Sequence, residues 1–269
     1  MHEYVQKSKD GQEAANSADG GQAVRPALVV QKIPASAPLS WLKRGVQDVH
    51  ACHYISLLYG VCFVLMGLGI DRAHSGNPAL ALGLSAGFLF AGSFLAMGLY
   101  ELSRQRQSGE PVDLLLSLFS WCRNPAAVGH FALYLSVIMM IWLRLSSTLL
   151  HAVGQPFGPA LAIAVLAWAL IALMVFMGSA VAIPMILDRP VGAVEAVRTS
   201  VRCCRVNSGA LALWAVIIAV SVGISLRLQY WPLLVVGPVL GHATWHAYQT
   251  CLRENDVPSG AGAIPGKGA

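Results

Sequence analysis

Charged residues are scarce in this chain of 269 residues. Only 12% of the residues are charged, whereas 56% are hydrophobic. A water-soluble protein of this length needs a charged shell around its core, and this composition does not provide one. The shortage therefore excludes an ordinary soluble protein. Because a helix needs roughly 20 apolar residues to cross a bilayer, the long charge-free runs predict membrane-spanning helices.

Enzyme signatures are also missing. The sequence contains no phosphate-binding loop, no GxGxxG opening a helix and no GxSxG elbow. No acidic residue lies deep in an apolar run, which argues against a proton-coupled or sodium-coupled transporter. None of the six cysteines falls on the predicted outer side, so structural disulfides are not expected. We therefore expect a protein that is not an enzyme and has no nucleic-acid partner.

The apolar runs predict an all-α, polytopic membrane protein with six transmembrane helices. The predicted spans are residues 54–70, 78–100, 126–150, 159–187, 209–226 and 231–248. The first forty residues are polar and without periodicity, as is typical of disorder. We therefore divide the chain into a disordered cytoplasmic tail (1–37), a six-helix integral membrane domain (38–252) and a flexible cytoplasmic tail (253–269).

Basic residues are distributed unevenly between the predicted loops. With six spans, fifteen of the eighteen Lys and Arg residues fall on the side of the two termini. Positive residues are enriched in cytoplasmic loops of membrane proteins. The sequence therefore predicts a multi-pass protein of the bacterial inner (cytoplasmic) membrane, with both termini cytoplasmic and the lipid bilayer as its surroundings.

A weak threefold repeat groups the spans. Three segments begin at a proline and place a short helix before the next span, which predicts three hairpins, each introduced by a cytoplasmic-side interfacial helix. In the third segment, Val194, Val197, Val201 and Cys204 share one face, which is expected to lie against the membrane. A neighbouring face carries Glu195, Arg198, Arg202 and Arg205.

Histidine provides the one candidate cofactor site. His242 and His246 are spaced i, i+4, so both rings project from one face of the last helix. This spacing suits two ligands to haem iron or a transition metal. It equally suits a structural role, because a histidine ring has an apolar body and a polar tip. Both interpretations stay open, and the identity of any cofactor is unknown.

Several other polar residues fall at or within the predicted spans. Arg144 lies inside the third span, where an arginine is costly, so it has either a structural role or marks an anion site. Glu101 and Arg104 are spaced i, i+3 at the exit of the second span and can pair. The candidate functional residues besides the histidine pair are Trp41, Asp48, Glu101, Arg104, Arg144, Asp188, Arg189, Trp245 and Tyr248.

Four motifs carry a family resemblance. They are WLKRGVQDV, GLYELSR, SAVAIPMILDRPV and GPVLGHATWHAYQ, in this order over roughly residues 36–252. Together they resemble the bacterial integral membrane proteins of the domain-of-unknown-function 2189 family. The matching positions are Trp41, Gly45, Asp48, Tyr100, Glu101, Ser103, Arg104, Pro184, Asp188, Arg189, Gly241, His242, Trp245, His246 and Tyr248. Some members carry the label of a cytochrome c oxidase subunit. This chain lacks the six-histidine core pattern of a catalytic oxidase subunit, so the resemblance implies an accessory role at most.

Three functions fit these observations. The leading hypothesis is a non-enzymatic inner-membrane protein that acts as an accessory or assembly partner of a respiratory complex. The second is a haem-binding or metal-binding membrane protein that uses His242 and His246. The third is a small-solute transporter, with Pro184, the Gly237–Pro238 pair and Arg144 as the indicators of its site.

Overall fold

The computed structural model describes residues 28–74, 78–152 and 159–254. The chain divides into two compact units, Val30–Cys251 and Met1–Val29 with Leu252–Ala269. Strands β1 (Leu28–Val30) and β2 (Leu252–Glu254) pair in a two-stranded sheet. Most of both predicted tails, residues 1–27 and 255–269, lies outside the described residues, so the predicted disorder there stays a prediction.

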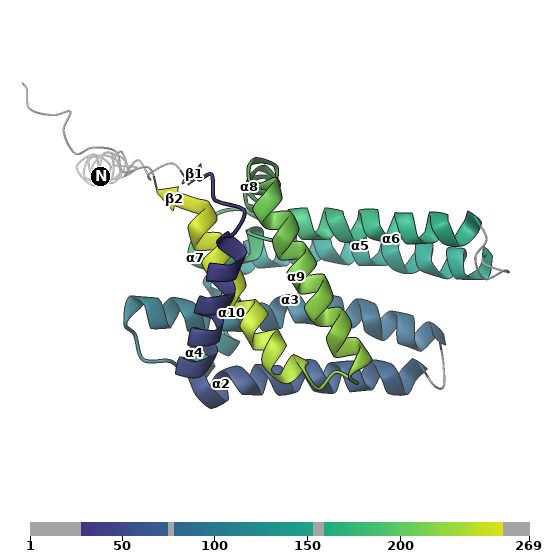
Figure 1. Ribbon diagram of the computed structural model, residues 1–269, viewed down its shortest axis with the longest axis horizontal. Coiled ribbons are helices and arrows are strands. Elements are labelled where there is room, and N and C mark those ends of the chain that lie inside the picture. Colours follow the sequence, from purple (N-terminus) through teal and green to yellow (C-terminus); the bar gives the residue numbers. More distant parts are fainter. Residues whose placement is uncertain (1–27, 75–77, 153–158, 255–269) are drawn as a thin grey trace, which may run out of the picture. The chain divides into compact units, whose positions relative to one another are not determined.

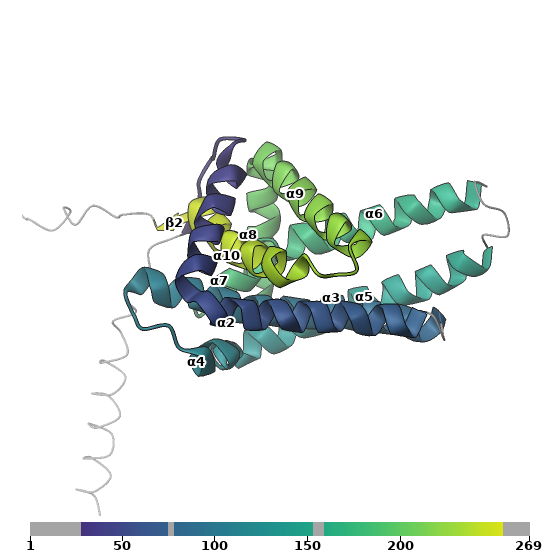
Figure 2. The ribbon, with the colours of Figure 1, turned by 60° about the horizontal axis from the view of Figure 1, so that its bottom comes forward.

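The unit Val30–Cys251 is helical throughout its described elements. In Figures 1 and 2, α2 runs beside α3 and α5 beside α6, and α10 packs chiefly along α2. Four of the six predicted spans lie within single helices, whereas 159–187 is interrupted between α6 and α7 and 231–248 begins two residues before α10. The elements are α2 (Ala37–His74), α3 (Pro78–Ser108), α4 (Leu114–Leu118), the 3-10 helix η1 (Ser120–Arg123), α5 (Pro125–Ala152), α6 (Pro159–Ser179), α7 (Ala182–Asp188), α8 (Ala193–Val206), α9 (Ser208–Arg227) and α10 (Leu233–Cys251).

Among the described residues, four segments are long and apolar enough to cross a membrane. They are Ala37–Ala73, Pro125–Thr148, Ala162–Asp188 and Ser208–Arg227. The all-α membrane class predicted from the sequence is therefore supported. The count of six spans and their hairpin grouping stay predictions, because they also require α3 and α10 to cross.

Two interruptions shape the helices. Helix α2 is kinked at His53, whose φ of 43° lies outside the helical range, so the residues before the kink form an arm distinct from the predicted first span. The second break separates α6 from α7. Pro184 has no N–H for the Ala180 carbonyl, and the hydroxyl of Ser200 bridges the break by donating to the Met177 carbonyl and accepting from the Val181 N–H.

Helix α8 packs on the protein mainly through its small residues. Its buried residues include Ala196, Ser200 and Cys203, whereas Val194 is exposed. Small side chains allow α8 to approach the α6–α7 break closely. Cys204 of the predicted apolar face is also buried, so that face is partly packed against the protein, and its position in the membrane interface stays a prediction.

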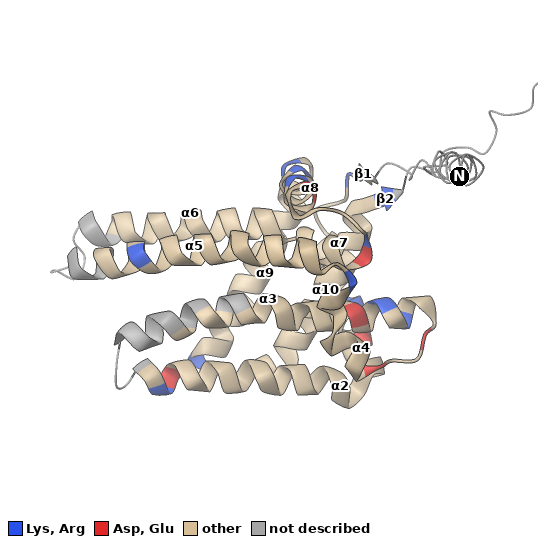
Figure 3. Ribbon diagram, turned by 180° about the vertical axis from the view of Figure 1, so that it is seen from behind, with Lys and Arg blue, Asp and Glu red and all other residues tan. Residues whose placement is uncertain are grey.

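Charge is concentrated in part of the unit. Figure 3 shows Lys and Arg in blue and Asp and Glu in red on α8, at the end of α7, around the junction of α3 with α4 and at the far end of α2, while long stretches of α5, α6 and α9 are uncharged. The polar residues singled out from the sequence lie mainly in the charged part.

Candidate functional site

The candidate site is a buried polar network where α2, α3 and α10 meet. Close packing of α2 on α10 makes it possible, because a Cβ on Gly60 would overlap the backbone of Leu234. The Leu234 carbonyl is also the one that would accept from residue 238, and Pro238 has no N–H to donate. The glycine and the proline thus bring the two helices together at matching positions.

Asp48 of α2 lies at the centre of this network and is only 2% exposed. Its Oδ2 accepts hydrogen bonds from Ser103 Oγ at 2.7 Å and from His246 Nε2 at 2.9 Å. Its Oδ1 accepts from the guanidinium of Arg106, with which it forms an ion pair. Asp48 therefore joins α2 to both α3 and α10 through charge-assisted bonds, which are the stronger class of hydrogen bond.

His242 of α10 is fully buried beside Asp48. Its Nδ1 lies 2.7 Å from Ser103 Oγ, and its Nε2 lies 2.9 Å from Ser56 Oγ. A serine hydroxyl has one proton, and Ser103 donates its proton to Asp48. His242 Nδ1–H must therefore donate to Ser103, and Nε2 shares a hydrogen bond with the Ser56 hydroxyl.

Both ring nitrogens of His246, one helical turn further along α10, also have hydrogen-bond partners. Its Nε2–H donates to Asp48, while its Nδ1 lies 3.2 Å from Gln107 Nε2 and accepts from that amide. Gln107 Oε1 in turn accepts from Trp245 Nε1 at 2.9 Å. Both imidazoles thus have both nitrogens occupied by protein partners.

This geometry bears on the histidine pair predicted as a cofactor site. The two rings do face one cluster, as their spacing indicated, and that cluster contains Asp48. Among the described residues, however, no group of three or more His, Cys, Asp or Glu residues is arranged to hold a metal ion. Ligation of a metal by His242 or His246 would require breaking a hydrogen bond to Ser56, Ser103, Asp48 or Gln107, so the residues present do not fit a bound metal or haem in this arrangement.

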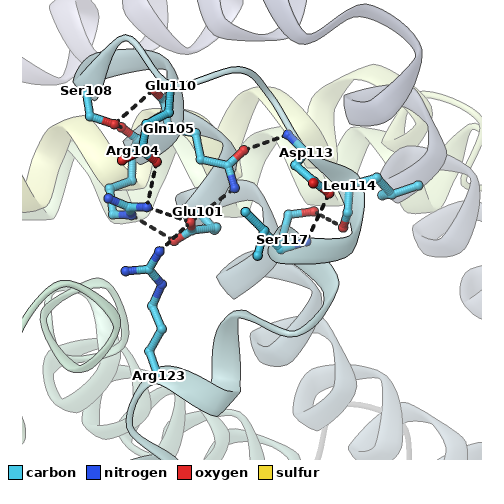
Figure 4. A network of polar contacts seen from close by, with 10 residues as sticks. Glu101, Arg104, Gln105, Ser108, Glu110, Asp113, Leu114, Ser117 and Arg123 are labelled. Carbon is cyan, nitrogen blue, oxygen red and sulfur yellow. Dashed lines mark hydrogen bonds and ion pairs between the residues drawn. The ribbon is translucent and has the colours of Figure 1, made fainter.

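A second network connects the end of α3 to the following segment (Figure 4). Glu101, fully buried, pairs with Arg104 at 2.9 Å and with Arg123 of η1 at 3.0 Å. The pairing of Glu101 with Arg104 is the one that their i, i+3 spacing predicted. Gln105 donates to Glu101 Oε1 and accepts from the Asp113 N–H, which fixes the chain that leads into α4.

A third group connects α7 to α10. The Tyr248 hydroxyl donates to Asp188 Oδ2 at 2.6 Å and accepts from Arg189 Nε at 3.3 Å. The ring of Tyr248 also packs against Trp245, with 5.4 Å between the centroids. Because Tyr248 is buried in α10 and its hydroxyl is bonded to Asp188 at the end of α7, it links the two helices.

Trp41 and Arg144 lie outside these groups. Trp41 is fully buried and packs edge-on against Trp214, with 5.8 Å between the ring centroids. Its Nε1 is the one buried side-chain N or O atom without a partner in the described part of the chain. Arg144 is exposed on α5, next to Met140, Ile141 and Thr148. The structure therefore does not place Arg144 with the other candidate residues.

Three members of the central network were missed at the level of sequence. Ser56 gives no local signal, because one serine in an apolar run is unremarkable. Arg106 and Gln107, however, follow Ser103 at i+3 and i+4, so the three side chains share one face of α3. That spacing could have identified α3 as the partner of Asp48 and the histidines.

Comparison with known families agrees with the membrane class. Residues 80–188 match the family model described as predicted integral membrane protein (DUF2189). The match confirms the family resemblance read from the motifs. It covers GLYELSR and most of SAVAIPMILDRPV, whereas Asp48, His242 and His246 lie outside the matched residues. No curated protein and no solved structure shows a significant match to the chain.

Proposed function

We propose that this integral membrane protein is a non-enzymatic accessory or assembly partner of another membrane protein complex. The observation that carries the proposal is that the polar atoms of the central network are bonded to other groups of the protein. Asp48, His242 and His246 direct their polar atoms to one another and to Ser56, Ser103, Arg106 and Gln107. A catalytic or ligand-binding site needs polar groups that reach a substrate, and these groups are committed to holding helices together.

The proposal includes the finer topology expected from the sequence. We infer six spans in three hairpins, with α3 and α10 crossing the bilayer beside the four apolar segments. Both termini then lie on the cytoplasmic side of the inner membrane, and so do the three polar networks. The bias of basic residues supports this orientation. An alkaline phosphatase fusion after residue 154 tests it, because the account expects an active fusion and an inactive one contradicts it.

The exposed arginines of α8 are the candidate contact for a partner. Arg198, Arg202 and Arg205 are exposed, and Glu195 is the one acidic residue of that helix. Such a basic surface steers association with an acidic partner surface. A respiratory complex is the partner that the family resemblance suggests, and the proposal requires a stable and stoichiometric association with it.

The test is purification of the full chain from native membranes in a mild detergent. The account expects a defined complex that migrates above the monomer on a native gel. The double substitution Arg198→Glu and Arg202→Glu should dissociate it, whereas Arg227→Glu, at the end of α9 on the predicted outer side, should leave it intact. A protein that is solitary under all solubilisation conditions, or a complex equally sensitive to both changes, argues against the proposal.

A further inference from the structure

The connection between α3 and α5 buries its small polar residues and exposes its large apolar ones. We name residues 114–123, which form α4 and η1, the α4–η1 segment. Its two serines are buried, with Ser117 at 0% and Ser120 at 3% exposure. Its large apolar residues are exposed instead, namely Leu115, Leu116, Leu118, Phe119 and Trp121. A connection bathed in water has the opposite pattern.

The buried side of the segment is firmly attached to the helices behind it. The Asp113 carboxylate caps α4 by accepting from the Leu115 N–H at 2.7 Å and the Leu116 N–H at 3.2 Å. The Ser117 hydroxyl lies 2.8 Å from the hydroxyl of Tyr59 on α2. At the other end, Arg123 pairs with Glu101 (Figure 4). The exposed apolar side is therefore a fixed surface rather than a transient state of a loose loop.

The position of the segment in the chain indicates what covers this surface. Helix α5, which follows it, is one of the apolar segments able to cross a membrane, and α3 precedes it. On the six-span topology proposed above, α3 also crosses the membrane, so the connection between α3 and α5 lies at the membrane surface, next to the headgroup region. Trp is enriched at that depth, and Trp121 is among the exposed side chains of the segment. Lipid therefore matches the exposed leucines and aromatic rings.

We propose that the α4–η1 segment is inserted into the cytoplasmic leaflet, with its leucines and aromatic rings in the boundary between headgroups and acyl chains. The partner of this surface is the lipid itself. The inference rests on the membrane embedding stated under Proposed function. The sequence predicted an interfacial helix before each hairpin, and the inference adds which side chains of this segment enter the leaflet, in the plane of the membrane as amphipathic interfacial helices lie.

Site-directed spin labelling in reconstituted liposomes tests this insertion. The background carries Cys62→Ser and Cys122→Ser, because Cys52, Cys203, Cys204 and Cys251 are buried. Labels are placed at Leu116→Cys and, as a second position on the same surface, Leu118→Cys. Leu166→Cys on the apolar α6 serves as the membrane control, and Glu110→Cys before the segment serves as the aqueous control. Power saturation compares accessibility to oxygen, which concentrates in lipid, and to a water-soluble nickel complex.

The proposal expects the labels at positions 116 and 118 to behave like the label at 166 and to be more accessible to oxygen than to the nickel complex. The label at position 110 should be more accessible to the nickel complex than to oxygen. Labels that match position 110 place the segment in water and overturn the inference. Labels shielded from both reagents indicate a protein contact, with a partner or a second copy, and overturn it as well. If the label at 166 itself fails to report lipid, the membrane embedding is refuted, so the two failures are distinguishable.

Discussion

The central network and the α5–α6 pair represent two ways of building a membrane protein. Around Asp48, three helices are joined by directional bonds between buried polar groups. Helix α6, by contrast, contains no charged residue and exposes a series of apolar side chains that includes Leu166 and Leu170. In lipid, apolar surface gives helices little reason to associate. The comparison indicates that the buried polar bonds around Asp48 determine which helices pack together, whereas the apolar side chains of α6 contact lipid.

The largest effect is expected from Asp48→Ala. The change leaves Arg106 without its partner and deprives Ser103 and His246 of their acceptor, and breaking a buried ion pair in this way costs ~3–5 kcal/mol. Thermal unfolding of the detergent-solubilised protein, followed by circular dichroism, measures the loss. Gln47→Ala changes the exposed neighbouring residue and should leave the unfolding temperature unchanged. An equal response to the two changes would show that the network does not stabilise the fold.

A smaller loss is expected from Gly60→Ala. The added methyl group meets the Leu234 backbone, which cannot move aside like a flexible side chain, so α2 and α10 must separate at a cost of about 3 kcal/mol. Gly69→Ala is the matched control in the same helix, because a Cβ there meets nothing within 4 Å. The same unfolding measurement applies, and a stabilised Gly60 variant would contradict the close packing of α2 on α10.

Glu101→Gln tests the second network. The amide keeps the shape of the side chain but loses the charge that Arg104 and Arg123 share, and hydrogen bonds to charged groups contribute about 1.5 kcal/mol or more. We expect a modest fall in unfolding temperature together with faster proteolysis between α3 and α5, because Arg123 no longer holds η1. Glu110→Gln, at the exposed end of the same network, is the control and should have almost no effect.

The smallest effect is expected on the apolar side. Leu170→Ala removes an exposed side chain from α6, so it creates no cavity, and its effect should stay within about 0.5 kcal/mol. Leu211→Ala in the buried face of α9 is the reference for a true core position and should lose about 2–5 kcal/mol. If Leu170→Ala is as damaging as Leu211→Ala, α6 packs against protein rather than lipid.

Sequence reasoning recovered the helical class and several members of the site, for identifiable reasons. Apolar runs of membrane length are a strong local signal, and the i, i+4 spacing of His242 and His246 correctly indicated a shared face. What these rings face depends on which helices become neighbours. Ser56 and His242 are separated by 186 residues, so no local pattern joins them. At the break near Ala180, the Val181 N–H and the Met177 carbonyl are likewise bonded by Ser200, which belongs to another helix and which no local pattern indicates.

The absorption spectrum and metal content of protein purified from its native membranes test the central claim most directly. The claim is that Asp48, His242 and His246 form a structural network whose imidazole nitrogens are all engaged by protein groups. The account predicts no Soret band and no stoichiometric transition metal. A Soret band or a bound metal that disappears in the His242→Ala, His246→Ala double variant, with membrane insertion preserved, would contradict it.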